Sequence, residues 1–455
     1  MRTTAAVWAG KATGALSRLT RRGGGTTFPG DVARAVDANV LRSLAGQLKG
    51  GAVLVTGTNG KTTTARLVSH LLEGLPASVV ANRAGANLIF GATAAAVSSA
   101  GLDGRLHADW GVFEIDEASL PAAVDEIAPK AVLVGNLFRD QLDRYGELEH
   151  TALTIQKALD RLAQGSRAVL NADDPRVGEI GLALNHKPLW YGLGDSRVAA
   201  ANLPHAADAI TCPRCGARLE FAAVFVGHDG IYRCPNRDFA RPAPDLEATD
   251  IRLTGLDGVA LRVGEDELRL PLGGLYNAYN LLAAYAVGTA IGLEAGYMAE
   301  RLRSVKAVFG RLERFQARGR RITILLAKNP ASFNEALRSA VELAGGSHFL
   351  IAINDRIADG RDVSWLWDVD FEMLKTRSAA IVPGGVRARD MAVRLKYAGV
   401  EHVEPPATDI GRALDRLLEL TPDAGDAYCL CTYTAMLDLR ALLVRRGWLR
   451  PYWET

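Results

Sequence analysis

The sequence has no long hydrophobic run, few cysteines and almost no net charge. No stretch approaches the roughly 18 apolar residues of a membrane-spanning helix. The five cysteines among 455 residues are too few and too unevenly spaced for a disulfide framework, which predicts a reducing, cytoplasmic compartment. The 53 basic and 51 acidic side chains nearly cancel, so the charge gives no indication of a nucleic-acid partner. What remains is a globular composition with room for two or three cores.

The N-terminal segment is basic but lacks the apolar region of a signal peptide, because Lys11 interrupts it. Its apolar spacing predicts a short amphipathic helix. We expect this helix to pack on the domain, and contact with anionic lipid is the alternative. The apolar positions that define the face are Trp8, Ala12, Ala15, Leu16 and Leu19.

Short apolar runs alternate with helical patterns, which predicts an α/β domain with a mostly parallel sheet. The first run, 52–55, leads into a glycine-rich turn and a helical pattern over 63–72. Further strands are expected at 79–80, 110–113, 131–134 and 168–170, and a helix at 151–162.

Residues 205–245 interrupt this alternation and predict an inserted module, because they hold three cysteines and a proline-rich end. A β-hairpin within 246–272 and a helix at 277–291 follow, and a domain boundary is expected near 310–316. Beyond it, apolar runs again alternate with helices and predict a second α/β domain, with strands at 322–326, 349–353 and 379–382.

The strongest motif is a phosphate-binding loop, TGTNGKTT, at 56–63. A strand, a tight glycine turn and a helix N-terminus direct several backbone N–H groups at one point. Lys61 can reach the β- and γ-phosphates, and the hydroxyl of Thr62 can ligate Mg²⁺. Val55 stands where the general pattern has a further glycine, so the loop is a shortened variant. The residues predicted to bind nucleotide are Gly57, Thr58, Asn59, Gly60, Lys61, Thr62 and Thr63.

A metal bound at Thr62 needs a carboxylate from a neighbouring strand end. Glu114 directly follows the apolar run 110–113, and Glu117 is a second candidate. Both stay candidates for holding Mg²⁺, and a solvated acidic turn is the alternative.

Four motifs in a fixed order are similar to those of the Mur ligase superfamily, which includes the folylpolyglutamate synthases. They are GTNGKT at 57–62, NADDP at 171–175, a helix carrying Asn277 and Asn280, and GRLE at 310–313. The resemblance implies that Asn277 and Asn280 lie near the adenine of ATP and that Arg311 approaches its phosphates. It implies an α/β fold: a Mur ligase-type P-loop central domain with a parallel sheet (1–315), an inserted zinc-ribbon-like module (205–245) and a C-terminal Rossmann-like α/β domain (316–455).

Further segments resemble one branch of that superfamily, the MurT-type ligase subunits. They lie at 23–30, 82–87, 136–145, 358–368 and 387–399, so the resemblance covers nearly the whole chain. It implies ATP-dependent amidation of the D-isoglutamate α-carboxylate of lipid II through an acyl phosphate, at the inner face of the membrane. A GatD-type glutaminase partner would deliver the ammonia.

Two pairs of residues bear on whether this chain or its partner generates the ammonia. Cys429 and Cys431 lie in an apolar strand without the glycine elbow of a nucleophile, so we interpret them as core residues and expect ammonia to form on another chain. In the family, an aspartate of the ligase subunit completes the partner's catalytic triad. Asp359 and Asp362 are both candidates for it, and a polar loop or helix cap is the alternative.

The sequence departs from the family pattern at two positions near the metal. Gln141 stands where amide-forming Mur ligases carry a histidine ligand, which puts a second Mg²⁺ in doubt. Lys157 is one residue away from the position of the family's carbamylated lysine, so we expect it on a solvated helix face without a catalytic role.

The module is also incomplete as a zinc ribbon. Arg237 occupies the expected fourth ligand position, and His228 or Asp238 could substitute. A ribbon that holds by packing alone is the alternative. The three predicted zinc ligands are Cys212, Cys215 and Cys234.

Two other functions remain open. One is a Mur-type or folylpolyglutamate-type ligase that joins an amino acid, although Gln141 and the acidic run 359–368 argue against it. The other is a non-catalytic scaffold that binds nucleotide and regulates a glutaminase, against which the intact Lys61, Thr62 and Glu114 argue.

Overall fold

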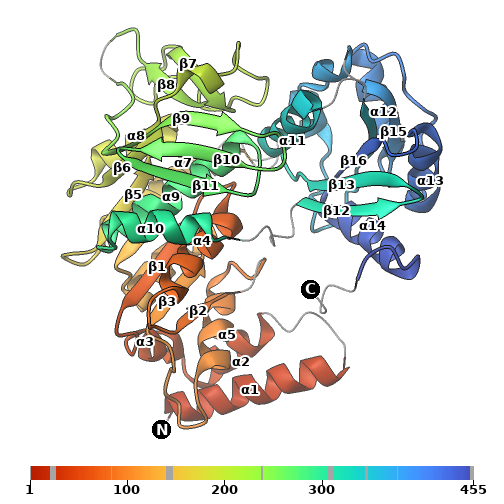
Figure 1. Cartoon of the computed structure of the whole chain (residues 1–455). Coiled ribbons are helices and arrows are strands. Elements are labelled where there is room, and N and C mark those ends of the chain that lie inside the picture. The colour runs from red at the N-terminus through yellow and green to blue at the C-terminus, as the bar shows by residue number, and fades with distance from the viewer. Residues whose placement is uncertain are drawn as a thin grey trace.

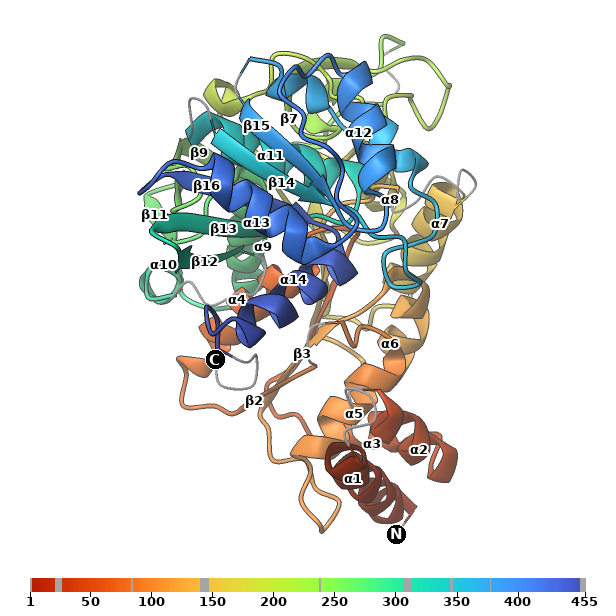
Figure 2. The same cartoon turned by 90° about the vertical axis from the view of Figure 1, so that its right-hand side faces the viewer.

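Two sheets lie side by side, each between layers of helices (Figures 1 and 2). This α/β arrangement confirms the predicted fold class. Among the described residues, no helix is both long and apolar enough to cross a membrane. The computed structural model describes residues 2–20, 27–82, 85–139, 147–236, 239–305, 312–343, 347–376 and 378–450.

The larger sheet has nine strands in the order β11-β10-β9-β6-β5-β4-β1-β3-β2. Strands β1 to β6 and β9 run parallel, and β10 and β11 add the predicted hairpin antiparallel at one edge. All predicted strands of this region form, whereas β6 and β9 were not predicted. Their bounds are β1 Gly51–Thr56, β2 Val79–Ala81, β3 Trp110–Glu114, β4 Ala131–Val134, β5 Arg167–Asn171, β6 Leu189–Leu193, β9 Leu246–Leu253, β10 Val259–Val263 and β11 Asp266–Leu270.

Alternating side chains of β1 point into two different cores, as strand geometry requires. Val53 and Val55 pack with helices α4 (Lys61–Glu73), α9 (Leu275–Ala290) and α10 (Ala295–Arg303). Ala52 and Leu54 pack on the other face of the sheet. That face is covered by α3 Val40–Ala45, α5 Ile89–Ser99, α6 Leu120–Ile127, α7 Glu147–Leu159 and α8 Pro175–Ala183. The chain also forms two short 3₁₀ turns, η1 Glu117–Ser119 before α6 and η3 Ser196–Val198 after β6.

The N-terminal helix forms and packs on the domain as predicted, but through other residues than the apolar positions that defined its expected face. Helix α1 (Arg2–Thr20) contacts α2 (Phe28–Val36) and α5 through small residues, while Trp8 and Leu16 are exposed. The reason is steric. At Gly10 an added Cβ would lie 2.9 Å from the Pro29 carbonyl oxygen, so the helices approach each other more closely than bulky side chains would permit.

The inserted module contains its own antiparallel pair, β7 (Glu220–Val226) and β8 (Asp229–Arg233). Beneath it lies a small core that includes Leu219, Tyr232 and Phe239. Tyr232 stacks on Phe239 with ring centroids 5.4 Å apart. The turn between β7 and β8 carries His228, which is fully buried.

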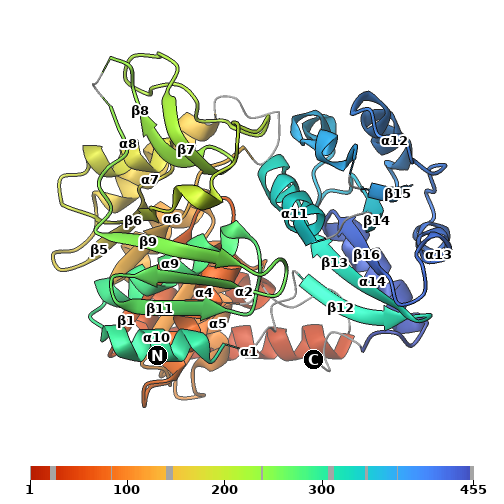
Figure 3. The same ribbon diagram turned by 45° about the horizontal axis from the view of Figure 1, so that its top comes forward.

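The second sheet has the order β12-β13-β16-β14-β15, parallel except for β12. Cys429 and Cys431 are buried in β16 as predicted, and burial raises the pKa of Cys429 to about 12. Figure 3 shows α11 on the side that faces the larger sheet. The elements are β12 Leu312–Ala317, β13 Arg320–Leu326, α11 Pro330–Leu343, β14 Ser347–Ala352, η4 Ser364–Asp368, η5 Phe371–Leu374, β15 Ser378–Gly384, α12 Ala388–Tyr397, α13 Ile410–Leu420, β16 Asp426–Cys431 and α14 Tyr433–Arg445.

Candidate active site

The phosphate loop joins the end of β1 to the start of α4 and needs glycine at two positions. Gly57 has φ +121° and Gly60 has φ +85°, a region that other residues rarely adopt. A Cβ on Gly60 would also lie 2.2 Å from Asn280 Oδ1 on α9. The loop and the asparagine helix, which carries Asn277 and Asn280, are therefore packed directly together.

The residues after β4 hold the middle of the loop in place. The Asn59 backbone N–H donates to Asn136 Oδ1 at 2.9 Å, and the Thr58 backbone N–H donates to the Asn136 carbonyl at 2.8 Å. The Thr58 hydroxyl donates to the Phe138 carbonyl at 3.1 Å and accepts from the Phe138 N–H at 3.0 Å. These bonds fix the loop without using the helix N-terminus, which stays available to a ligand.

The two candidate carboxylates take different places around the loop. The Thr62 hydroxyl donates to Glu114 Oε2 at 2.8 Å. Glu117 Oε1 lies 2.9 Å from Lys61 Nζ and accepts from the Gly57 backbone N–H at 3.1 Å. A hydroxyl beside a carboxylate offers the hard oxygens that Mg²⁺ prefers, so Thr62 and Glu114 fit the ion. Glu117 instead occupies the position where Lys61 and the loop N–H would receive a phosphate.

Asn82 positions Glu114 and was missed as a functional residue. Its side chain donates to the Glu114 carbonyl at 2.8 Å and accepts from the Glu114 N–H at 2.8 Å. Asn82 follows β2, the strand next to β3, so the two strand ends meet. Its place directly after a predicted strand was the available signal.

A pocket that is open to solvent lies between the phosphate loop and α11. Asn59 and Asn280 line it, and Asn329 Nδ2 donates to Asn59 Oδ1 at 3.1 Å across the two lobes. Asn277 Oδ1 accepts from Asn280 Nδ2 at 3.0 Å and orients that amide. The walls are largely apolar, which suits a flat base, and come from Phe138, Val226, Leu325, Leu326, Ala331 and Ala336.

Three carboxyl groups are buried together beside this cavity. Asp173 pairs with Arg241 at 2.6 Å and accepts from the Tyr279 hydroxyl at 2.6 Å. Burial raises the pKa of Asp229 well above its ordinary value, and the charges of Asp174 and Asp173 raise it further. One oxygen of Asp229, Oδ1, is buried without a hydrogen-bond partner. Arg241 therefore offsets the negative charge of Asp173, and the surroundings of Asp229 favour its protonated form.

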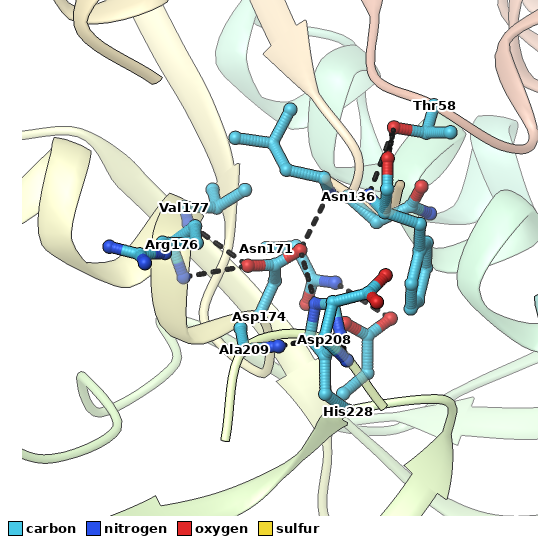
Figure 4. A network of polar contacts seen from close by, with 12 residues as sticks. Thr58, Asn136, Asn171, Asp174, Arg176, Val177, Asp208, Ala209 and His228 are labelled. Atoms are coloured by element: carbon cyan, nitrogen blue, oxygen red, sulfur yellow. Dashed lines mark hydrogen bonds and ion pairs between the residues drawn. The ribbon is translucent and has the colours of Figure 1, made fainter. Parts of the chain in front are cut away.

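His228 links the module to this cluster (Figure 4). Its Nδ1 lies 3.2 Å from the Asp208 N–H and 3.3 Å from the Ala209 N–H, so Nδ1 accepts and the proton is on Nε2. Nε2 then donates to Asp174 Oδ2 at 3.3 Å. Asp174 Oδ2 also accepts from the Leu137 N–H at 2.7 Å, beside the segment that holds Thr58. Asp174, His228 and Asp229 lie close enough together to hold a metal ion, but both ring nitrogens of His228 are used in hydrogen bonds.

The three predicted zinc ligands do converge. The sulfur atoms of Cys212, Cys215 and Cys234 lie within 4.8 Å of one another, and those of Cys215 and Cys234 are 3.5 Å apart. The backbone N–H of Ala217, then the Cys234 thiol, lower the pKa of Cys215. Three cysteine thiols, one of which has a lowered pKa, fit zinc as three of its four ligands. The suggestion that His228 supplies the fourth is wrong, because its ring is bonded to Asp174; Arg237 and Asp238 lie outside the described residues.

The two candidate triad aspartates differ in their contacts. Asp359 is buried and caps α14, accepting from the Thr434 N–H at 2.8 Å and from the Thr434 hydroxyl. Asp362 is half-buried and accepts through Oδ1 alone, from the Ser364 N–H and hydroxyl. Lys157 is exposed on α7. Gln141 and Arg311 lie outside the described residues.

Two family models match the chain. The Mur ligase middle domain matches residues 55–227, and the MurT ligase C-terminal domain matches residues 326–436. With the phosphate loop at the end of β1 and the asparagine helix against it, these matches define a Mur ligase-type chain. The chain belongs to the MurT family of ligase subunits.

Relatives that match nearly the full length of this chain support the family assignment. The MurT subunit of lipid II isoglutaminyl synthase from Staphylococcus aureus (strain N315) is 32% identical, over 92% of this chain and 93% of the relative. The subunit of the same description from Streptococcus pneumoniae (strain ATCC BAA-255 / R6) is 34% identical over 95% of each chain.

Solved structures share the fold at lower identity. A pseudomurein peptide ligase type C from Methanothermus fervidus superposes with a TM-score of 0.68 at 21% identity, over 90% of this chain and 81% of that one. The MurF ligase from Thermotoga maritima, solved in complex with ADP, has a TM-score of 0.62 at 14% identity, over 91% of this chain and 85% of that one. The predicted Mur ligase-type fold is thereby confirmed.

Proposed function

We propose that this chain uses ATP to phosphorylate the α-carboxylate of D-isoglutamate in lipid II and then directs ammonia to the resulting acyl phosphate. The observation that carries the proposal is the arrangement of Lys61, Thr62 and Glu114 around a glycine turn beside an apolar cavity. The near-full-length likeness to the MurT subunits narrows the substrate to lipid II and implies a partner subunit.

The chain's own residues would act by positioning and charge. The loop N–H groups and Lys61 bind the β- and γ-phosphates, once Glu117 gives up its contacts with both. Asn280 faces the base cavity next to the loop. Mg²⁺ on Thr62 and Glu114 would neutralise phosphate charge. Arg311 would approach the phosphates by the family resemblance.

The reaction proceeds in two displacements. A carboxylate oxygen bonds to the γ-phosphorus as its bond to ADP breaks, so phosphate becomes the leaving group on the acyl carbon. Ammonia then forms the C–N bond, inorganic phosphate leaves and a proton is lost, giving D-isoglutamine. The buried, high-pKa thiols of Cys429 and Cys431 do not suit glutamine hydrolysis, which supports a GatD-type glutaminase as the ammonia source.

Lys61→Ala tests the assignment. We expect glutamine-dependent amidation to fall on the order of 10²–10³-fold, because a preorganised charge contributes about 3–4 kcal/mol to the barrier. The complex with the glutaminase should still assemble. Lys157→Ala, which removes an exposed lysine on α7, is the matched control. Normal turnover in Lys61→Ala would overturn the proposal.

We further propose that Asp362, rather than Asp359, serves the partner's triad, since Asp359 already caps α14 with both oxygens. Asp362→Asn should abolish glutamine-dependent amidation and leave amidation with ammonium salts intact. Asp359→Asn should lower the melting temperature instead. Glutamine-dependent activity that survives Asp362→Asn would reject this choice.

A further inference from the structure

In the described part of the chain, the outer side of helix α1 exposes large apolar side chains. Its inner side packs on α2 and α5 through small residues, among them Ala6, Val7 and Gly10. Trp8 is 56% exposed and Leu16 is 61% exposed, and Figures 1 and 2 show α1 as an outermost element of the larger lobe. A helix that buries its small residues and exposes its large ones presents an apolar surface to solvent, and such surfaces mark interaction sites. We define the α1 face as Trp8, Ala12, Ala15 and Leu16, which are all exposed.

Neighbouring groups extend this surface and suit a lipid interface. The indole N–H of Trp8 donates to the Leu102 carbonyl at 2.7 Å, which leaves its apolar ring outward, and Leu102 itself is 70% exposed. A tryptophan with a satisfied N–H and a free ring is typical of membrane interfaces. Phe28, at the start of α2, is exposed as well.

The charge of α1 indicates which kind of lipid surface the helix would bind. Its 19 residues include three basic side chains and no acidic one, although the whole chain is nearly neutral. A helix that carries basic and no acidic side chains along an apolar face complements an anionic bilayer surface, and one of these basic groups, Lys11, donates to the Ser98 carbonyl at 2.8 Å. Asp103, the acidic residue beside Leu102, faces His107 at 3.9 Å.

We propose that the α1 face docks on an anionic lipid bilayer and holds the enzyme at the surface that displays its substrate. The inference rests on the proposed function, because a lipid-linked substrate is what makes such docking useful. The helix lies flat on the bilayer rather than crossing it, as the length and composition of α1 require.

The test uses the full-length protein and sedimentation with two vesicle types, phosphatidylcholine alone and phosphatidylcholine with phosphatidylglycerol. Wild type should bind the anionic vesicles, and the double variant Trp8→Glu/Leu16→Glu should bind them at least about tenfold more weakly. The matched control is Leu153→Glu/Leu182→Glu, which places the same charges on exposed leucines of α7 and α8 and should bind like wild type.

Measurements of amidation test the docking proposal separately from the proposed function. Both double variants should amidate a soluble stem-peptide substrate at the wild-type rate, and only Trp8→Glu/Leu16→Glu should lose activity on vesicle-bound lipid II. Wild type that amidates the soluble substrate but ignores both vesicles would overturn the docking proposal alone. Unchanged vesicle binding by Trp8→Glu/Leu16→Glu would also overturn it. So would a wild-type protein that binds no vesicles but forms a dimer, if this variant converts the dimer to a monomer. Vesicle binding without any amidation would instead remove the proposed function.

Discussion

Gly60→Ala gives the sharpest test of the packing between the phosphate loop and the asparagine helix. Alanine at φ +85° costs roughly 1–2 kcal/mol in backbone strain. Its Cβ would also lie 2.2 Å from Asn280 Oδ1, so the amide must move and release its hydrogen bond with Thr64, worth about 1 kcal/mol. Gly165→Ala is the matched control, since its φ is +88° and nothing lies within 4 Å of the added Cβ.

Both variants should therefore lose comparable stability from strain, and only Gly60→Ala should lose affinity for ATP. We expect its dissociation constant in isothermal calorimetry with Mg²⁺ to rise tenfold or more, since each factor of ten is about 1.4 kcal/mol. Adding Asn280→Ser to Gly60→Ala removes the clashing oxygen and should recover part of that loss, measured against Asn280→Ser alone. Equal affinities for Gly60→Ala and Gly165→Ala would refute the reasoning.

Three further predictions concern the module and the acid cluster. His228→Phe should lower the melting temperature more than His228→Gln, because glutamine can still donate to Asp174; equal losses would count against the hydrogen bond. Metal analysis should find about one zinc per chain, and Cys234→Ser should lose it; zinc-free protein with an intact module would reject the site. Because burial raises the pKa of Asp229, the stability this carboxyl contributes is complete below its ordinary pKa of 3.8 and is lost as pH rises through the folded value. Asp229→Asn should thus gain melting temperature relative to wild type as pH rises from 4 to 8, and a pH-independent difference would exclude this linkage.

The phosphate loop was predictable because its signal is local. A strand, two glycines with positive φ and a Lys-Thr pair at a helix start lie within about ten residues. The choice between Glu114 and Glu117 was not predictable, because Glu114 is the last residue of β3 and Glu117 follows it by only three residues. Only the backbone path decides that the first reaches Thr62 and the second reaches Lys61.

Long-range contacts explain what the sequence analysis missed. Asn136 holds the loop from 77 residues away, and Asn329 reaches it across 270 residues. The side of α1 that packs on the domain was missed for a related reason: periodicity finds an apolar face but does not say which side the neighbouring helices will cover. Here Gly10, rather than Trp8, decides that side, since close approach requires a missing Cβ.

The contacts between the two lobes determine how much free energy holds the lobes together. Arg139 joins Asp368 at 3.5 Å, the His205 ring lies 2.6 Å from Asp370, and Asn329 meets Asn59. Partly exposed polar contacts of this kind are worth about 0–1 kcal/mol each. Leu256, buried in the core of the second lobe, adds about 1.5–3 kcal/mol. Arg314 with Asp257, and Arg338 with the Phe225 carbonyl, add two more contacts of the same kind, so these contacts together contribute a few kcal/mol. A nucleotide bound between the loop and α11 would shift the balance between joined and separated lobes by the difference in its affinity for the two states. A difference of about a hundredfold, roughly 2.7 kcal/mol, would be comparable with the contacts themselves.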